Sequence, residues 1–417
     1  MIKVVHLQIA TESTGRAPLR LHRAFLQSGI NSLMFTLRRS INDDEKIKQK
    51  KFWPKLVAWF DQNIQSYLNR SNRKEFGVFS YPIFGSDVSK VPQIKNADLI
   101  YIHWALGGFL NFESLKKIAK LGKPVIFFMH DMWNITGGCH HSFTCQKYTE
   151  HCYNCPMLVP DKKRDRSYRE FEKKLKLYSK FDNLYFVAPS KWLYQCAREA
   201  ALTQNKPIYY IPNIIDHSFF KPFEKKIAKN ILNIKASDIV IAFGSASLTS
   251  PYKGWPYLKE ALNILSKDKN FRYGITILIF GNGHNKTITD AIPFKIKFMG
   301  FLRDEYSTML SYNAADVFIA PSLADNLPTT VLESLSCGTP VVGFNVGGIP
   351  DMIRDRQNGY LAKYKDAYDI YEGIKFCIQN KIKGYTPPEF DEDTILKKHF
   401  DLHTSTKISL ENKYVQN

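Results

Sequence analysis

Two carboxylates near residue 330 have a spacing that suits the binding of a charged ligand. In the stretch "APSLADNLPTTVLESLSCGTPVVGFNVGG" (320–348), Asp325 and Glu333 are separated by seven residues. We expect Asp325 to lie in a loop, and Glu333 to lie about one and a half turns into a helix that begins near Pro328. The free N–H groups at residues 329–331 would attract an anion to the start of this helix. The pattern therefore predicts a phosphate on a helix N-terminus, with both carboxylates pointing at one ligand.

Four cysteines gathered within 17 residues form a second chemically distinctive stretch, "GGCHHSFTCQKYTEHCYNCP" (137–156). They are Cys139, Cys145, Cys152 and Cys155. Four thiolates would close the coordination sphere of a zinc ion, so we expect a structural zinc site rather than a catalytic one. The first pair is spaced more widely than in common zinc sites. Unbound or redox-active thiols are the first alternative, and disulfides are a second one that a reducing compartment disfavours.

The elements that must position these groups follow an alternating α/β pattern. Short runs rich in β-branched and aromatic residues alternate with helical patterns, which is typical of parallel sheets with helices on their faces. In the first half we expect strands at 3–10, 31–37, 98–104, 124–131, 183–190 and 208–213, and helices at 112–122 and 190–202. The series then restarts, with strands at 238–247, 274–283, 296–302, 316–322 and 339–348.

A chain of 417 residues exceeds the usual size of a single core, so two domains are expected. Pro222 and a charge run without a β pattern predict a linker between the halves. Two α/β domains joined there would face each other across a central cleft, because open α/β sheets bind ligands at the carboxyl ends of their strands. We expect a Rossmann-like domain over 1–215 with a Cys-rich insert at 132–160, a linker at 216–230, a second Rossmann-like domain over 231–391, and a tail at 392–417.

The formal charge of +19 indicates a partner that carries phosphate: a nucleotide, a nucleic acid or an anionic membrane. An AT-rich genome that favours lysine is an alternative cause. The N-terminus "MIKVVHLQIATESTG" suits a first strand better than a signal peptide, and no run approaches the ~18 apolar residues of a membrane span. We therefore expect a cytoplasmic protein.

Residues 46–70 combine lysines with aromatic residues at helical spacing, namely Trp53, Val57, Phe60, Ile64 and Tyr67. Such a basic amphipathic helix can lie on an anionic membrane surface, which would place the protein on the inner face of the cell membrane. The alternative is a helix whose apolar stripe packs on its own domain.

The stretch 320–353 resembles the signature of glycosyltransferase family 4, the retaining enzymes with the two-domain GT-B fold. The family has an acidic residue, seven residues, then Glu, followed by a "CGTPVV…GG" segment, although here Asp325 stands in place of the usual Glu. The resemblance implies that Glu333 binds the ribose of a nucleotide-sugar. It also implies that Asp325 and the groups after it touch the donor, namely Asn326, Thr329, Thr330 and Val331.

Other donor-site positions follow from the same resemblance. Lys253, in "SASLTSPYKGWPYLKEAL", would hold the donor diphosphate and stabilise the leaving group, although the Arg that often precedes it is missing. The alternative for Lys253 is a solvated side chain after a turn. The loop "FGNGHN" (280–285), with Gly281 and Gly283, would lie beside the base, and Phe301 and Leu302 would border it.

In the first half, "TESTGRAPLRLHRAFLQSGINS" (11–32) resembles the family's first loop and helix. Gly15 would let the backbone approach the donor phosphate or the acceptor closely, and Arg16 would contact the phosphate, although the double glycine of many relatives is absent. His130, at the end of the strand in "FFMHDMW", would contact the donor sugar; a structural histidine is the alternative, and His103 is a weaker second candidate. The tail at 392–417 would fold back on the first domain, as in related GT-B chains.

The sequence thus predicts a retaining glycosyltransferase that moves a sugar from a nucleotide-sugar to a glycan or lipid-linked glycan. The pattern "HDMW…TGGCH…C…C…CP" is similar to a branch that builds cell-surface polysaccharides. No metal cofactor is required for that reaction, and no DxD motif is placed to bind one. The alternatives are a sugar-nucleotide epimerase on the same fold and a nucleic-acid-binding protein with a zinc cluster. The second leaves the two carboxylates unexplained, so we expect no nucleic acid partner.

Overall fold

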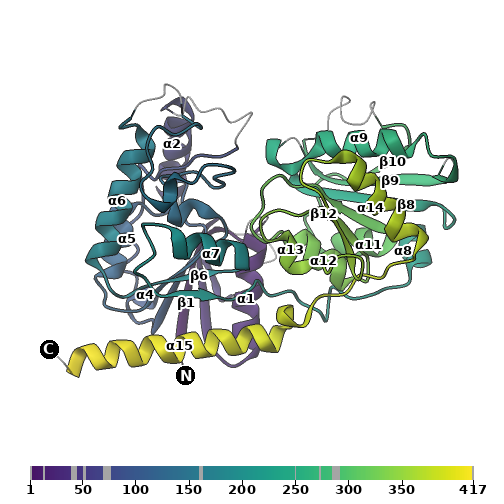
Figure 1. Ribbon diagram of the computed structural model, residues 1–417. Helices are drawn as coiled ribbons and strands as arrows, with labels where there is room; N and C mark the ends of the chain where they lie inside the picture. Colours follow the sequence, from purple (N-terminus) through teal and green to yellow (C-terminus); the bar gives the residue numbers. More distant parts are fainter. Residues whose placement is uncertain are drawn as a thin grey trace. The chain divides into compact units, whose positions relative to one another are not determined.

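The computed structural model describes residues 2–12, 15–38, 45–49, 53–68, 77–158, 163–248, 250–271, 274–283 and 292–415. These residues form two compact units. Unit 1 comprises Met1–Ile214 and Asp393–Asn417, and unit 2 comprises Ile215–Glu392. Each unit is an α/β structure built on one parallel sheet (Figure 1).

Unit 1 contains a seven-stranded parallel sheet with the order β3-β2-β1-β4-β5-β6-β7. Its strands are β1 (Lys3–Ala10), β2 (Asn31–Arg38), β3 (Ile47–Gln49), β4 (Leu99–Ile102), β5 (Val125–Phe128), β6 (Leu184–Ala188) and β7 (Ile208–Tyr210). Every residue of β4, β5 and β6 is buried, which explains their continuous apolar sequences. The strand order reverses between β1 and β4, and ligands of such sheets bind at the carboxyl ends beside this reversal.

The helices of unit 1 cover both faces of this sheet. They are α1 (Arg16–Gln27), α2 (Trp53–Leu68), α4 (Pro92–Lys95), α5 (Phe112–Ala119), α6 (Arg166–Lys180) and α7 (Lys191–Glu199), with the 3₁₀ helices η2 (Met132–Ile135) and η3 (Lys147–Thr149). Ser190 caps α7 by accepting a hydrogen bond from the amide of Leu193.

The C-terminal tail is a long helix, α15 (Glu392–Val415), that runs along unit 1 (Figure 1). Ile395 and Leu402 are buried in the same core cluster as Val4 and Leu21 of β1 and α1. The tail residues therefore complete the hydrophobic core on one face of the first sheet.

Unit 2 contains a six-stranded parallel sheet with the order β10-β9-β8-β11-β12-β13. Its strands are β8 (Ile239–Ser247), β9 (Ile275–Asn282), β10 (Lys295–Phe298), β11 (Val317–Ala320), β12 (Val341–Phe344) and β13 (Gly359–Ala362). Its helices are α8 (Lys225–Ile231), α9 (Trp255–Leu265), α11 (Glu305–Ala314), α12 (Thr329–Ser336), α13 (Ile349–Met352) and α14 (Ala367–Gln379), with the 3₁₀ helices η4 (Pro251–Lys253), η5 (Lys269–Phe271) and η6 (Pro388–Phe390).

The strands of unit 2 separate two hydrophobic cores. Along β8, Val240 and Ala242 belong to one cluster, whereas Ile241 and Phe243 belong to the other. Alternate side chains of a strand point to opposite faces, so both faces of this sheet are covered. The order reverses between β8 and β11, which predicts a ligand site where these two strands end.

The expected linker at 216–230 is part of unit 2 rather than a separate segment. Within it, α8 buries Ala228 and Lys229. Lys229 Nζ lies 3.1 Å from an oxygen of Asp316 and donates a hydrogen bond of 2.6 Å to the carbonyl of Asp238. The charge run that suggested a linker therefore includes a buried lysine that fastens α8 to the second sheet.

The expected helix at 46–70 begins only at Trp53, because Ile47–Gln49 form the edge strand β3. Among the side chains of α2 that the structure describes, Ala58, Asp61 and Gln65 are buried, and none of these belongs to the predicted apolar stripe. Leu56, Trp59 and Phe60 are exposed, while Val57 and Ile64 are half-buried. The side chains of Trp53 and Tyr67 lie outside the described residues.

Polar contacts fix the inner face of α2. Asp61 accepts hydrogen bonds from the amides of Ile83 and Phe84 at 3.0 and 2.9 Å. Burial raises the pKa of Asp61 although these hydrogen bonds oppose the shift. The helix therefore presents Leu56, Trp59 and Phe60 outward, and this apolar surface is not covered by the described part of unit 1.

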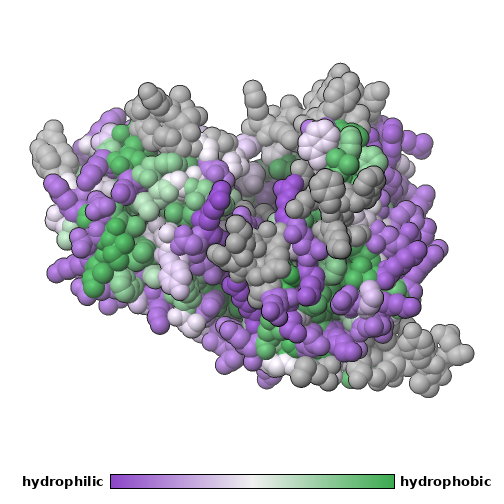
Figure 2. Space-filling view, turned by 180° about the vertical axis from the view of Figure 1, so that it is seen from behind, coloured by the Kyte–Doolittle hydropathy of each residue, from purple (hydrophilic) through white to green (hydrophobic). Residues whose placement is uncertain are grey.

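Among the described residues, we find no helix with the length and apolar character needed to cross a membrane. In the space-filling view (Figure 2), hydrophilic residues cover much of the described surface, and hydrophobic residues show in separate areas.

Candidate active site

In unit 2, two oppositely charged side chains meet beside the reversal of strand order. Lys253 ends η4, which follows β8, and Asp325 lies in the loop between β11 and α12. Lys253 Nζ donates to Asp325 Oδ2 at 2.6 Å. Burial alone would lower the pKa of Lys253, but the Asp325 carboxylate raises it above the usual range. Lys253 is therefore a fixed cation at neutral pH.

Backbone contacts hold the two loops together. The amide of Leu323 donates to the carbonyl of Tyr252 at 2.7 Å. Gly254 has φ +69°, and a Cβ atom there would lie 1.7 Å from the carbonyl oxygen of Pro321. Only glycine fits this conformation and this close approach, which explains the "KG" pair in the sequence.

Two consecutive glycines, Gly347 and Gly348, support the Asp325 loop from the other side. Gly347 has φ +58°, and a Cβ atom there would lie 2.0 Å from the carbonyl oxygen of Asp325. The amide of Gly348 donates to the same oxygen at 3.2 Å. Ser322 Oγ, which sequence reasoning missed, lies 3.3 Å from Asp325 Oδ2. The glycines after β12 therefore set the position of the acidic loop.

The helix after this loop is α12, with Pro328 as its N-cap residue and Cys337 as its C-cap residue. The expectation of three free amides at its start is wrong for Val331, whose N–H donates to the carbonyl of Pro328 at 3.0 Å. The side chain of Val331 is buried in the core. Thr329 and Thr330 are half-buried in the first turn, and Asn326 is buried in the preceding loop.

Glu333 is almost completely buried, with 2% of its surface exposed. Its Oε2 accepts a hydrogen bond of 2.9 Å from the hydroxyl of Tyr312 on α11. A buried carboxylate must be hydrogen-bonded or paired, so Tyr312 has a direct role in holding Glu333. Sequence reasoning missed Tyr312. The only signal was an aromatic hydroxyl near the end of the helical stretch that precedes the strand "DVFIA".

The residues expected beside the nucleotide base lie in two adjacent loops. The amide of Gly281, near the end of β9, donates to the carbonyl of Gly300 at 2.8 Å, which joins the end of β9 to the loop after β10. Gly281 is buried and Gly283 is exposed. Phe301 and Leu302 are half-buried next to Gly300, whereas residues 284–285 lie outside the described residues.

In unit 1, the predicted residues also follow the strands beside the reversal. Gly15 is the buried N-cap residue of α1, and Arg16 is the first residue of that helix. His130 follows β5, and its Nε2 lies 3.0 Å from Nδ1 of His103, which follows β4. The start of α1 and both histidines line one hollow, through Ala17 and Pro18. The structure thus brings His103, the weaker candidate, into contact with His130.

Burial governs the protonation of His130. It lowers the pKa of His130 to about 4, although the neighbouring Asp131 opposes the shift. The ring is therefore neutral at pH 7, and it can donate one hydrogen bond and accept another.

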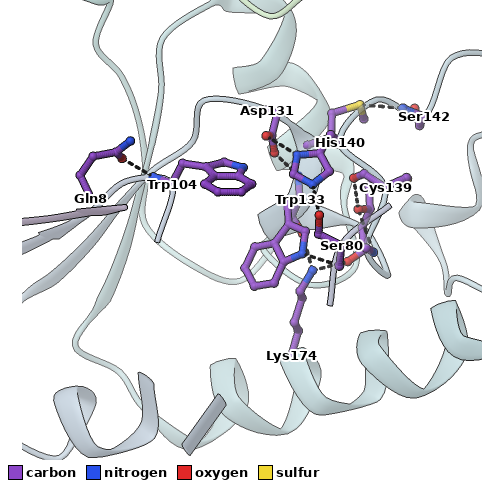
Figure 3. A network of polar contacts seen from close by, with 12 residues as sticks. Gln8, Ser80, Trp104, Asp131, Trp133, Cys139, His140, Ser142 and Lys174 are labelled. Carbon is purple, nitrogen blue, oxygen red and sulfur yellow. Dashed lines mark hydrogen bonds and ion pairs between the residues drawn. The ribbon is translucent and has the colours of Figure 1, made fainter. Parts of the chain in front are cut away.

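Next to His130, Asp131 begins a buried polar network that sequence reasoning missed (Figure 3). Asp131 Oδ2 lies 2.6 Å from His140 Nδ1, and His140 Nε2 lies 2.9 Å from Ser80 Oγ. Burial would raise the pKa of Asp131, but His140 and the amide of Trp133 lower it. The order resembles a hydrolytic triad, but Ser80 and His140 are both buried, so we interpret the network as an anchor for residues 131–140.

Lys174 of α6 supports the same segment from inside the protein. Its ammonium group donates to the carbonyl oxygens of Trp133 and Thr136, the latter at 2.8 Å, and lies 3.6 Å from the centroid of the Trp133 ring. Burial lowers the pKa of Lys174 to about 7. A fully buried lysine therefore caps the end of η2, the short helix that begins two residues after His130.

The four clustered cysteines do not form the expected zinc site in the described part of the chain. No group of three or more His, Cys, Asp or Glu side chains there is arranged to hold a metal ion. All four cysteines are free, so disulfides are not formed either. Burial raises the pKa of Cys139, Cys152 and Cys155 to about 12, which keeps these thiols protonated. Hydrogen bonds accepted by Asp131, together with those of His140 and Lys174, hold the insert instead.

Comparisons with known proteins show which family and fold this chain is similar to. Residues 237–380 match the family model described as glycosyl transferases group 1. The chain is 21% identical over 404 residues to WcaC of Escherichia coli K12, a protein named for colanic acid biosynthesis, and the match covers 93% of each chain.

Two solved structures show the same fold along the whole chain. HepE of Anabaena, solved in complex with UDP and glucose, has a TM-score of 0.61 and 17% identity, covering 97% of this chain and 100% of that one. WaaG, a glycosyltransferase involved in lipopolysaccharide biosynthesis, has a TM-score of 0.59 and 13% identity, covering 98% of each chain.

Proposed function

Because this chain is a group 1 glycosyltransferase with the GT-B fold, we propose that it transfers a sugar from a uridine diphosphate sugar to a glycan acceptor with retention at the anomeric carbon. The observation that best supports this donor site is the Lys253–Asp325 ion pair, which lies at the strand-order reversal of unit 2 and within the residues that match the family. HepE, which is similar along its whole length, was solved with UDP and glucose, and this supports a uridine nucleotide.

The chemistry follows from the charges at this site. The diphosphate of the donor binds at Lys253 and the first turn of α12, where Thr329 and Thr330 lie. As the bond to the anomeric carbon breaks, negative charge grows on the diphosphate, and a fixed cation stabilises it. Asp325 holds Lys253 in place and keeps it protonated before the donor arrives. The acceptor hydroxyl then attacks from the face that the diphosphate leaves, and a donor phosphate oxygen takes its proton.

Glu333 binds the ribose hydroxyls of the donor through its carboxylate, which Tyr312 holds in place. Unit 1 supplies the acceptor site and contributes His130, with Gly15 and Arg16, to the donor sugar and phosphate. The relatives named for colanic acid and lipopolysaccharide biosynthesis support a cell-surface polysaccharide, or its lipid-linked precursor, as the acceptor.

Replacing Glu333 with glutamine tests the donor site. Glutamine can still accept the hydrogen bond from Tyr312, so the fold should persist, but the charged acceptor for the ribose is lost. Hydrogen bonds to charged groups contribute about 1.5–3 kcal/mol, so we expect KM for the uridine diphosphate sugar to rise about 10-fold to 100-fold. Steady-state transfer assays measure this change. The control is Glu260→Gln, at an exposed position of α9. An unchanged KM in Glu333→Gln would remove Glu333 from the donor site.

We further propose that the exposed surface of α2 contacts an anionic membrane that carries the acceptor. Leu56, Trp59 and Phe60 are exposed together, and Lys46 and Lys48 are exposed beside β3. Apolar side chains with nearby lysines bind anionic bilayers by burial and by charge attraction. The net charge of +19 favours the same partner.

A double substitution, Trp59→Ser with Phe60→Ser, should weaken binding to vesicles of mixed neutral and anionic lipid by at least about tenfold. Vesicle sedimentation at low and high salt measures this, because only the lysine contribution is screened by salt. The control, Tyr306→Ser, removes an exposed aromatic residue of unit 2. Equal binding by the parent and the double variant would refute this surface as the membrane contact.

A further inference from the structure

Three imidazoles form a hydrogen-bonded row across the central strands of the first sheet. His6 Nδ1 lies 3.0 Å from His103 Nε2, and His103 Nδ1 lies 3.0 Å from His130 Nε2. The three residues belong to or follow β1, β4 and β5, which are neighbours in the sheet. His6 is 0% exposed and His103 is 6% exposed. The row therefore links the interior of unit 1 to the candidate site residue.

A neutral imidazole has one N–H donor and one nitrogen that accepts. Each contact in the row joins Nδ1 of one ring to Nε2 of the next. All three rings must then carry their proton on the same type of nitrogen: either all on Nδ1, with His6 donating toward His130, or all on Nε2, with His130 donating toward His6.

The buried end of the row decides between these two arrangements. His6 Nε2 is buried and has no hydrogen-bond partner among the described residues. If it carried the proton, a donor would be left unpaired in the core, and orphaned buried N–H groups are rarer than unsatisfied acceptors. The proton of His6 therefore lies on Nδ1, and the same holds for His103 and His130. Burial lowers the pKa of His6 and His103 well below the usual range, so the rings are neutral.

We propose that His6 and His103 are positioning residues that fix His130 in the tautomer with its proton on Nδ1, so that this N–H is its hydrogen-bond donor to the substrate. The row uses the Nε2 atom of His130 and leaves Nδ1 for the ligand. The consequence for catalysis rests on the proposed function, in which His130 contacts the donor sugar. The tautomer itself does not depend on that role.

Nitrogen NMR of protein labelled with ¹⁵N-histidine measures the tautomer directly. The signals of His130 are identified by their loss in His130→Ala. We expect the parent protein at neutral pH to show His130 protonated on Nδ1, whereas histidine in water prefers the proton on Nε2. A parent His130 with its proton on Nε2 overturns the proposal.

Two substitutions of His103 distinguish an effect of its hydrogen bond to His130 from an effect on packing alone. In His103→Asn, the amide nitrogen can occupy the position of Nδ1 and donate to His130. In His103→Gln, the amide instead reaches the position of Nε2 and meets His6. We expect the asparagine variant to keep the Nδ1 proton of His130 and most of the parent kcat. The glutamine variant should shift His130 toward the Nε2 tautomer and lose about tenfold in kcat.

Identical His130 signals in the two His103 variants would also overturn the proposal. The parent measurement remains decisive if either variant fails to fold. The control is His151→Gln, because His151 contacts Glu172 and lies outside the row; the His130 signals should not change. If His130→Ala retains the parent kcat, the proposed role of His130 in transfer fails, but the tautomer assignment stands or falls on the NMR alone.

Discussion

Replacing Lys253 with methionine is expected to lower kcat for sugar transfer by a factor of about 10²–10³. Lys253 Nζ is the cation fixed by Asp325 at 2.6 Å beside the start of α12. Methionine has a similar length but no charge, so the leaving diphosphate loses its stabilisation at the moment the bond breaks. KM for the donor should change less than kcat, because the charge on the diphosphate grows during the reaction.

The matched control is Lys267→Met, which removes an exposed lysine of unit 2. Lys253→Arg keeps the charge but changes its geometry, so its kcat should lie between those of the parent and Lys253→Met. Thermal unfolding of each variant shows whether the unpaired Asp325 disturbs the fold. A folded Lys253→Met protein that keeps more than a third of the parent kcat would exclude Lys253 as the group that stabilises the leaving diphosphate.

The local arrangement around Asp325 and Glu333 could be predicted from the sequence because these residues are close together along the chain. Asp325, Glu333 and the glycines at 347–348 lie within one strand–helix–strand unit, so their spacing already determines their arrangement. Gly254 and Gly347 are required by backbone approaches of 1.7 and 2.0 Å, and glycine is the residue type that marks such approaches.

Contacts between residues far apart in the chain could not be predicted in this way. Tyr312 meets Glu333 from another helix, and Ser80 meets His140 across 60 residues of sequence. The Cys-rich insert has a spacing that suggests zinc, yet a buried lysine and an aspartate–histidine pair hold it in the described structure. The helical spacing of apolar residues in α2 could be seen in the sequence. Which face of α2 is buried could not, because it depends on the hydrogen bonds that Asp61 accepts from the distant amides of Ile83 and Phe84.

The same limit applies to a group of histidines in unit 1 that are spread from residue 6 to residue 403 but form one cluster, namely His6, His22, His103, His130, His399 and His403. Tyr101 Oη lies 2.9 Å from His399 Nδ1 and 2.8 Å from His403 Nε2, and the ring of His6 stacks on that of Tyr101. Burial lowers the pKa of His6, His103 and His399 well below the usual range, and that of His130 and His403 to about 4.

These shifts predict that unit 1 loses stability as the pH falls from about 6.5 to about 4. In this range the unfolded chain takes up protons on these histidines while the folded chain keeps them neutral. The contribution of these histidines to the free energy of unfolding is therefore complete above pH 6.5, and it is lost as the pH falls toward 4. A shift from 6.5 to 4 corresponds to about 3 kcal/mol for one histidine.

His403→Gln should reduce this pH dependence by the contribution of one proton, about 1.4 kcal/mol per pH unit within the window. Glutamine does not titrate, and its amide reaches the position of Nε2, so the contact with Tyr101 can persist. Urea unfolding followed by circular dichroism between pH 4.5 and 7.5 measures the slope. His217→Gln, in unit 2 and outside the cluster, should leave it unchanged. If His403→Gln has the same slope as the parent, His403 takes up its proton in the folded protein at the same pH as in the unfolded chain. Tyr101 would then have to accept a hydrogen bond from a buried imidazolium, and α15 would be held by charge rather than by neutral packing.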